Sequence, residues 1–172
     1  MSEAKGKLTE RRTLTLERTY DADLEDVWDL WTTAEGLESW WGPDGFRIEV
    51  RSLDLRPGGQ LLYAMIADGP QQVAFMKNAG MPLVQECLIT YREIVPRTRL
   101  AYVHLTDFVP GVAPYDVGTV VELVEASDGV RMRVTLDAMH DVEWTRRAAM
   151  GWEMQLGKLA QVLAKPRTRP HA

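Results

Sequence analysis

Of the three histidines, His140 stands in the surroundings richest in possible chemistry, the segment Met139-His140-Asp141-Val142-Glu143. An imidazole beside carboxylates can act as a general base or as a metal ligand. The same residues are also typical of a helix start, where Asp141 would accept from the first amides and both acids would oppose the positive end of the helix dipole. Because the segment holds one His and no Cys, it lacks the ligand spacing of a zinc site, and we predict no metal.

His104 lies on an expected strand and shares one face with Leu100, Tyr102 and Thr106 if the strand is regularly pleated. If that face points inward, Tyr102 and His104 are polar groups in an apolar cavity and can orient a ligand. If it points outward, they are solvated strand residues. The alternation alone leaves both alternatives open.

Motifs of catalysis and of cofactor binding are missing from the sequence. There is no GxSxG, no phosphate-binding glycine loop and no HExxH. The lone Cys87 excludes an internal disulfide and fits a small buried residue on a strand. We therefore predict no catalytic residue and no cofactor.

Methionine and aromatic side chains supply candidates for the wall of an apolar binding site. Methionine suits adaptable apolar sites because it is flexible and polarisable, and ordinary core filling is the alternative. Trp40 and Trp41 would point about 100° apart on a helix, so we expect only one of them in the core and the other near a cavity mouth. The candidate lining residues are Trp41, Tyr63, Met65, Phe75, Met76, Tyr102, His104, Met132, Val134, Met139, His140, Met150 and Trp152.

The inter-strand segment from Asp68 to Pro82 is longer than a hairpin turn requires. It carries the consecutive apolar residues 73–76 and Met81. We expect a loop that acts either as a lid over the cavity or as a contact in a homodimer.

Composition limits the classes of function. A chain of 172 residues suits one domain, and a net charge of -5 argues against nucleic acid as a partner. No apolar run is long enough to span a bilayer, and the polar start lacks a secretory signal, so we expect a cytoplasmic protein. We expect flexible tails at 1–10 and 166–172, the second including His171, around a domain at 11–165.

The elements follow from periodicity. Residues 12–19 alternate as a first strand, a helix of about three turns begins at Leu24, and a short helix fits 34–40. Six strands follow, near 46–55, 61–66, 86–95, 99–106, 119–124 and 130–138, with a bulge near Ser52 and a hairpin turn at 127–129. One helical stripe over 144–164 contains Ala148, Trp152, Leu156, Leu159 and Leu163. The plan is α+β: a curved antiparallel sheet of about seven strands around a long C-terminal helix, with two short helices between strands 1 and 2.

Several blocks carry a family resemblance. They are LEDVWDLWT at 24–32, GLESWWGP at 36–43, LDLRPGG at 53–59, YREIVP at 91–96, and Gly151-Trp152 with the leucines of the last helix. Together they resemble the branch of the SRPBCC (START-like, helix-grip) superfamily that is similar to the activator of heat-shock-protein-ninety ATPase.

The resemblance implies the helix-grip fold and an internal cavity that binds a hydrophobic or amphiphilic small molecule without catalysis. It also implies two alternatives. One is a protein-interaction module that activates a chaperone ATPase. The other is a cyclase or hydrolase that uses His104 or His140 as acid or base.

Overall fold

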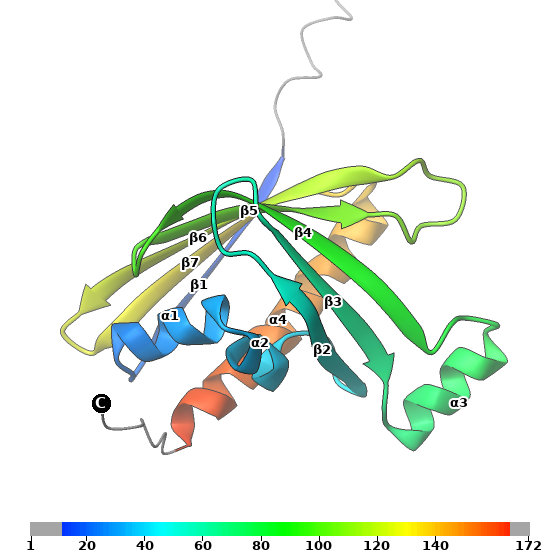
Figure 1. Cartoon of the computed structure of the whole chain (residues 1–172), viewed down its shortest axis with the longest axis horizontal. Coiled ribbons are helices and arrows are strands. Elements are labelled where there is room, and N and C mark those ends of the chain that lie inside the picture. Colours follow the sequence, from blue (N-terminus) through cyan, green and yellow to red (C-terminus); the bar gives the residue numbers. More distant parts are fainter. Residues whose placement is uncertain (1–11, 166–172) are drawn as a thin grey trace, which may run out of the picture.

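The computed structural model describes residues 12–165, which form one antiparallel sheet and four helices. In chain order the elements are β1 (Thr13–Tyr20), α1 (Leu24–Thr32), α2 (Ala34–Trp40), β2 (Phe46–Leu53), β3 (Gln60–Ala67), α3 (Pro70–Asn78), β4 (Val84–Val95), β5 (Arg99–Thr106), β6 (Tyr115–Ala126), β7 (Gly129–Asp137) and α4 (Val142–Ala164). Figure 1 shows the sheet curving around the long α4, with α1 and α2 beside it.

The strands follow the order β1-β7-β6-β5-β4-β3-β2, and every neighbouring pair is antiparallel. From β2 to β7 each strand pairs with the next along the chain, as in a meander. β1 alone pairs with a strand distant in sequence, β7. Since β1 and β2 are opposite edges of the sheet, α1 and α2 carry the chain from one edge to the other (Figure 1).

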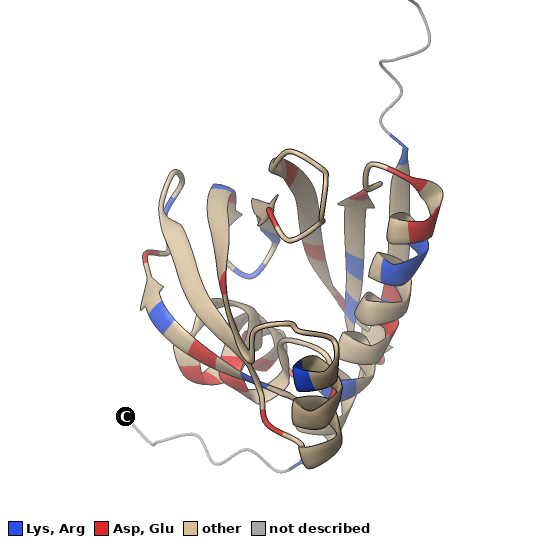
Figure 2. Cartoon of the chain, turned by 90° about the vertical axis from the view of Figure 1, so that its right-hand side faces the viewer, with Lys and Arg blue, Asp and Glu red and all other residues tan. Residues whose placement is uncertain are grey.

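The long helix α4 covers the concave face of the sheet (Figure 2). Its stripe of apolar residues has the spacing that places them on one side. Leu156 and Leu159, in the C-terminal half, are buried in the hydrophobic core. The amphipathic pattern therefore fixes which side of α4 faces the sheet.

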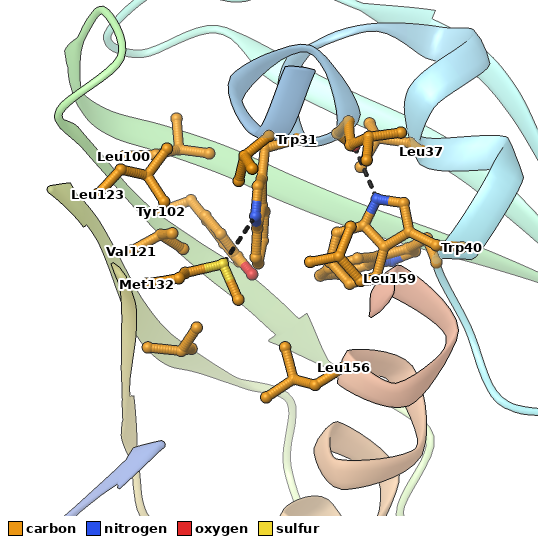
Figure 3. Close-up of a cluster of buried hydrophobic side chains, with 14 of the residues drawn as sticks. Trp31, Leu37, Trp40, Leu100, Tyr102, Val121, Leu123, Met132, Leu156 and Leu159 are labelled. Atoms are coloured by element: carbon orange, nitrogen blue, oxygen red, sulfur yellow. Dashed lines mark hydrogen bonds between the residues drawn. The ribbon is translucent and has the colours of Figure 1, made fainter. Parts of the chain in front are cut away.

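Tryptophans from α1 and α2 fill the core next to α4 (Figure 3). Trp31 and Trp40 lie edge to face at 4.8 Å between ring centroids, a favourable aromatic arrangement. Both indole N–H groups have buried partners: Trp31 Nε1 donates to Met132 Sδ at 3.3 Å, and Trp40 Nε1 donates to the Leu30 carbonyl at 2.7 Å. The rings are thus held by polar as well as apolar contacts.

The expected α+β architecture is confirmed, down to two local features. The pairing of β2 with β3 shifts register between Val50 and Ser52, which is the expected bulge. Ala126 pairs with Gly129 across the expected hairpin turn between β6 and β7. Gly129 is required there because its φ is +130° and a Cβ would lie 1.9 Å from the Tyr20 carbonyl oxygen.

The expectation of a loop at 68–82 is wrong, because Pro70–Asn78 form the helix α3. Proline is well suited to the first turn of a helix. The four apolar residues at 73–76 are consecutive, so they gave no helical spacing in the sequence. Met76 is buried, whereas Phe75 is 62% exposed.

The expected tails at 1–10 and 166–172, with His171, lie outside the described residues. Within residues 12–165, no helix combines the length and the apolar character that crossing a membrane requires.

Candidate functional site: an apolar cavity under the N-terminal half of α4

A cavity of about 300 Å³ lies between the concave face of the sheet and the N-terminal half of α4. Its walls are mainly apolar. They come from all strands except β2, from α4, from the turn after α2, and from Phe108 and Met139 in the segments after β5 and β7. The cavity is partly enclosed, and its volume is at the lower end of the range that is usual for small-molecule sites.

Small residues on α4 leave this space open. Ala148 and Gly151 face the cavity one to two turns before Leu156, the first of the leucines that close the core, and Trp152 and Gln155 line the cavity as well. A Cβ built on Gly151 would meet no atom within 4 Å. The same helical stripe therefore seals the core with its second half and leaves a hollow under its first half.

Trp41 forms part of the cavity wall and is also buried in the core beside Trp40. The expectation that only one of the two indoles reaches the core is wrong. Trp41 is the residue that ends α2, and its φ of -69° and ψ of 146° are extended rather than helical. The usual angle between neighbours on a helix therefore does not apply, and the two rings meet edge to face at 5.2 Å.

Two hydrogen bonds from α4 hold the turn that follows Trp41. Gln155 Oε1 accepts from the Gly42 amide at 2.8 Å, and Lys158 Nζ donates to the Gly42 carbonyl at 2.9 Å. Gly42 has a φ of +88°, and a Cβ there would lie 2.8 Å from Ile48 Cδ1. These contacts fix Trp41 and the turn against α4 at the cavity wall.

His104 on β5 points into the cavity, so the inward alternative holds for this face of the strand. Its Nε2 lies 3.4 Å from the Tyr63 hydroxyl on β3, a long hydrogen bond. Burial lowers the pKa of His104 from 6.5 to about 4, because the charged ring would lose its hydration; Asp107 opposes this shift weakly. At neutral pH the imidazole is therefore uncharged.

Tyr102, two residues before His104, is 3% exposed and also lines the cavity. No protein group hydrogen-bonds its hydroxyl. Its register partner on β6 is Thr119. Desolvation raises the pKa of Tyr102 far above neutral pH, so the hydroxyl keeps its proton.

The structure brings seven of the thirteen candidate residues together at the cavity and places six elsewhere. The seven are Trp41, Tyr63, Met65, Tyr102, His104, Met139 and Trp152. Met132 and Val134 are fully buried in the closed part of the core, and Met76 is buried on α3. Phe75 and Met150 are largely exposed, and His140 lies outside the cavity wall. No residue of 68–82 lines the cavity, which gives α3 no role as its lid.

His140 belongs to the start of α4. Its Nδ1 lies 2.7 Å from the Tyr115 hydroxyl, which also accepts from the His140 amide at 3.1 Å. Asp141 caps the helix, as one of the two alternatives predicted, by accepting from the Trp144 amide at 2.7 Å. Across residues 12–165, no group of three or more His, Cys, Asp or Glu side chains is arranged to hold a metal ion.

Several lining residues were missed at the sequence level. Gln85 and Cys87 on β4 are in phase with the buried Ile89 and Tyr91, two residues apart along the strand, and this spacing could have placed them on the inner face. Burial raises the pKa of the Cys87 thiol to about 11, so it behaves as a small apolar group. Gly151 gave no signal, because a glycine inside a helix pattern marks neither a face nor a cavity.

The strand order, the long helix across the sheet and the partly enclosed cavity are those of a helix-grip fold. Residues 21–164 match the model of the family described as "Activator of Hsp90 ATPase homolog 1-like protein". The chain belongs to this family.

Solved structures agree on the fold. A protein from Chromobacterium violaceum is similar with a TM-score of 0.71 at 23% identity, over 90% of this chain and 99% of that one. A protein from Nitrosomonas europaea has a TM-score of 0.65 at 24% identity, over 88% and 93%. The AHSA1 protein from Silicibacter pomeroyi has a TM-score of 0.68 at 18% identity, over 89% and 98%. No protein of curated function matches the sequence significantly.

Proposed function

We propose that this protein binds a hydrophobic or amphiphilic small molecule in the cavity under α4 and does not transform it. The observation that carries the proposal is the hollow itself. Protein cores are normally close-packed. Here Ala148 and Gly151 lie on the inner face of α4, at positions where larger side chains would fill the space. An apolar wall with a few polar groups is the usual composition of a ligand site.

The polar groups of the wall favour binding over catalysis. A general base works best with a pKa near the working pH, and burial moves the pKa of His104 to about 4. The ring nitrogen of His104 contacts the hydroxyl of Tyr63. A carboxylate in that place would stabilise a charged imidazole, and a tyrosine does not. His140, the other candidate base, is engaged with Tyr115 at the start of α4.

The experiment compares two glycines of α4. Gly151 lines the cavity, whereas Gly157 is exposed on the same helix, and a Cβ at either position would meet nothing within 4 Å. Leu at either position should raise the free energy of unfolding by about 0.5–1 kcal/mol, because glycine is the poorer helix former. Only Gly151→Leu places a side chain in the cavity.

Binding of naphthalene is measured by isothermal titration calorimetry. We expect one saturable site in the wild type and in Gly157→Leu, and a loss of at least tenfold in affinity in Gly151→Leu. Thermal unfolding of each variant confirms that it is folded. If wild type binds no apolar probe at one saturable site, or if Gly151→Leu binds as tightly as Gly157→Leu, the proposal is wrong.

A further inference from the structure

The imidazole of His104 presents one ring nitrogen to the cavity. His104 lines the cavity from β5, and its Nε2 lies 3.4 Å from the Tyr63 hydroxyl. Its other nitrogen, Nδ1, has no hydrogen-bond partner in the described part of the chain. Nδ1 is not buried either, because within residues 12–165 the one buried side-chain polar atom without a partner is the Tyr102 hydroxyl. Nδ1 is therefore accessible, and it is reached from the cavity.

The Tyr63 hydroxyl decides which ring nitrogen carries the hydrogen. Tyr63 is buried, and this burial raises the pKa of its hydroxyl well above the ordinary value, so the hydroxyl is protonated at neutral pH. Among residues 12–165, the acceptor in reach of that proton is His104 Nε2. A hydrogen on Nε2 would leave the buried hydroxyl proton without an acceptor, which is costly. We therefore assign Nε2 as the acceptor and Nδ1 as the N–H group.

As a result, a neutral hydrogen-bond donor faces an apolar space. His104 is uncharged at neutral pH because of its burial, so Nδ1–H is the donor of a neutral ring rather than half of an ion pair. Such a donor pairs with a lone pair on oxygen or nitrogen. A ligand that carries an acceptor at this point gains a hydrogen bond that a hydrocarbon of the same shape does not.

The charge of the wall restricts the acceptor further. Among the described residues that line the cavity, none is Lys or Arg, and the one acidic residue is Asp137. The Asp137 carboxylate is itself engaged, because its Oδ2 accepts from the Gly118 amide at 3.1 Å. An ionised carboxylate or phosphate would lose its hydration with no cation to receive it. An uncharged acceptor carries no such penalty.

Aromatic rings line the path to this donor. Trp152 and Trp41 lie 5.5 Å apart between ring centroids, Trp41 and Tyr63 lie 6.4 Å apart, and Tyr63 and His104 lie 6.2 Å apart. All four residues line the cavity, so a row of rings runs from α4 to His104 on β5. Flat aromatic ligands pack well against such rings.

Size limits the ligand to about two rings. The cavity of about 300 Å³ is roughly twice the ~150 Å³ cavity that takes up benzene in an apolar protein core. Two fused rings with a short substituent fit this volume.

We propose that the ligand is an uncharged aromatic compound of about two rings with a hydrogen-bond acceptor, and that His104 Nδ1–H donates to this acceptor. This inference rests on the proposed function, since it names the class of molecule that the same cavity binds. Tyr63 acts as a positioning residue, because its hydroxyl holds the imidazole in the tautomer that donates. Apolar acids are selected against.

The binding test compares three probes that share one ring system: naphthalene, 2-acetylnaphthalene and 2-naphthoate. Calorimetry with the wild type at pH 7.5 should show 2-acetylnaphthalene binding about fivefold more tightly than naphthalene, the net gain from one hydrogen bond. The anion 2-naphthoate should bind at least about tenfold more weakly than the ketone, because it must be desolvated.

Two substitutions of His104 separate the donor from the shape of the ring. His104→Leu removes the N–H group, and the ketone should then bind about as tightly as naphthalene. His104→Asn should keep most of the ketone preference, because its Nδ2 stands two bonds from Cβ, as Nδ1 does. His140→Leu is the control, since it removes a histidine outside the cavity wall and should leave the preference unchanged. Thermal unfolding shows whether each variant is folded.

The tautomer is measured without any ligand. Two-bond ¹H–¹⁵N correlation NMR distinguishes a protonated ring nitrogen from a bare one. In the wild type at pH 7.5, we expect Nδ1 of His104 to carry the hydrogen and Nε2 to be bare. This measurement decides the assignment even if His104→Leu does not fold.

Each outcome bears on the proposal. A hydrogen on Nε2, no gain from the carbonyl, tighter binding of 2-naphthoate than of the ketone, or a ketone preference that survives in His104→Leu overturns the inference and leaves the proposed function intact. An equal loss of the preference in His140→Leu also overturns it. If the wild type binds none of the three probes, both fail.

Discussion

The histidine in the cavity wall should make the stability of this protein depend on pH in a way that one substitution removes. In the folded state His104 is kept neutral by burial, with a pKa of about 4 against 6.5 for an exposed imidazole. Between these two values the unfolded chain binds a proton that the folded chain does not. Stability is therefore fully present above pH 6.5, falls as pH drops from 6.5 to 4, and loses no more from this group below pH 4.

The size of the effect follows from the two pKa values. At pH 4.5 the wild type should have lost about 2.5 kcal/mol of unfolding free energy through His104 alone, relative to pH 8. For a chain of this length, that corresponds to a decrease of about 5–10 °C in Tm. Other groups also titrate in this window, so only the difference between variants isolates the histidine.

The assay is urea unfolding at pH 8 and pH 4.5 for the wild type, His104→Gln and His140→Gln. His104→Gln should lose about 2.5 kcal/mol less than the wild type on acidification. His140→Gln is the control, because it removes a histidine outside the cavity and should keep the contribution of His104. Equal acid losses in wild type and His104→Gln, or a His104 ring signal that titrates near pH 6.5 in NMR, would refute a desolvated imidazole.

Two further predictions concern local structure. Asp141→Ala should lower the unfolding free energy by about 1 kcal/mol by removing the cap on the Trp144 amide, and Asp141→Asn should retain most of it; unchanged thermal stability of the alanine variant would exclude a capping role. Gly129→Ala should cost more than about 2 kcal/mol, because it adds overlap with the Tyr20 carbonyl to an unfavourable φ. Gly58→Ala, with φ +83° and open space, should cost only about 1 kcal/mol in chemical denaturation, and equal costs at the two glycines would contradict the overlap.

Most of the fold was accessible from sequence because its signals are local. Strand alternation, the hairpin turn at Gly129 and the apolar stripe of α4 each depend on neighbours a few residues away. α3 escaped prediction because only Met76 of its apolar residues is buried, so the helix has little apolar periodicity to show.

The site was less accessible because it depends on long-range placement. On β5 the set Leu100, Tyr102, His104 mixes apolar and polar residues, whereas Ala101 and Val103 on the other face are both apolar. Alternation therefore separated the two sets without showing which was inside. Met132 and Val134 do face inward, yet they lie in the filled part of the core rather than in the hollow. Whether an inward side chain lies in the filled core or at the cavity depends on which half of α4 packs over that part of the sheet.

The pairing of β1 with β7 has a consequence for synthesis of the chain. Thr13 pairs with Asp137, so the first strand emerges from the ribosome more than a hundred residues before its only partner in the sheet. At translation rates of about 5–20 residues per second, β1 waits roughly 5–20 s with its hydrogen-bonding edge unpaired. Meanwhile β2 to β6 can pair with one another in the order in which they leave the ribosome. β1 therefore joins the sheet last, by pairing with β7, and it is the strand most exposed to mispairing with other chains in the cell.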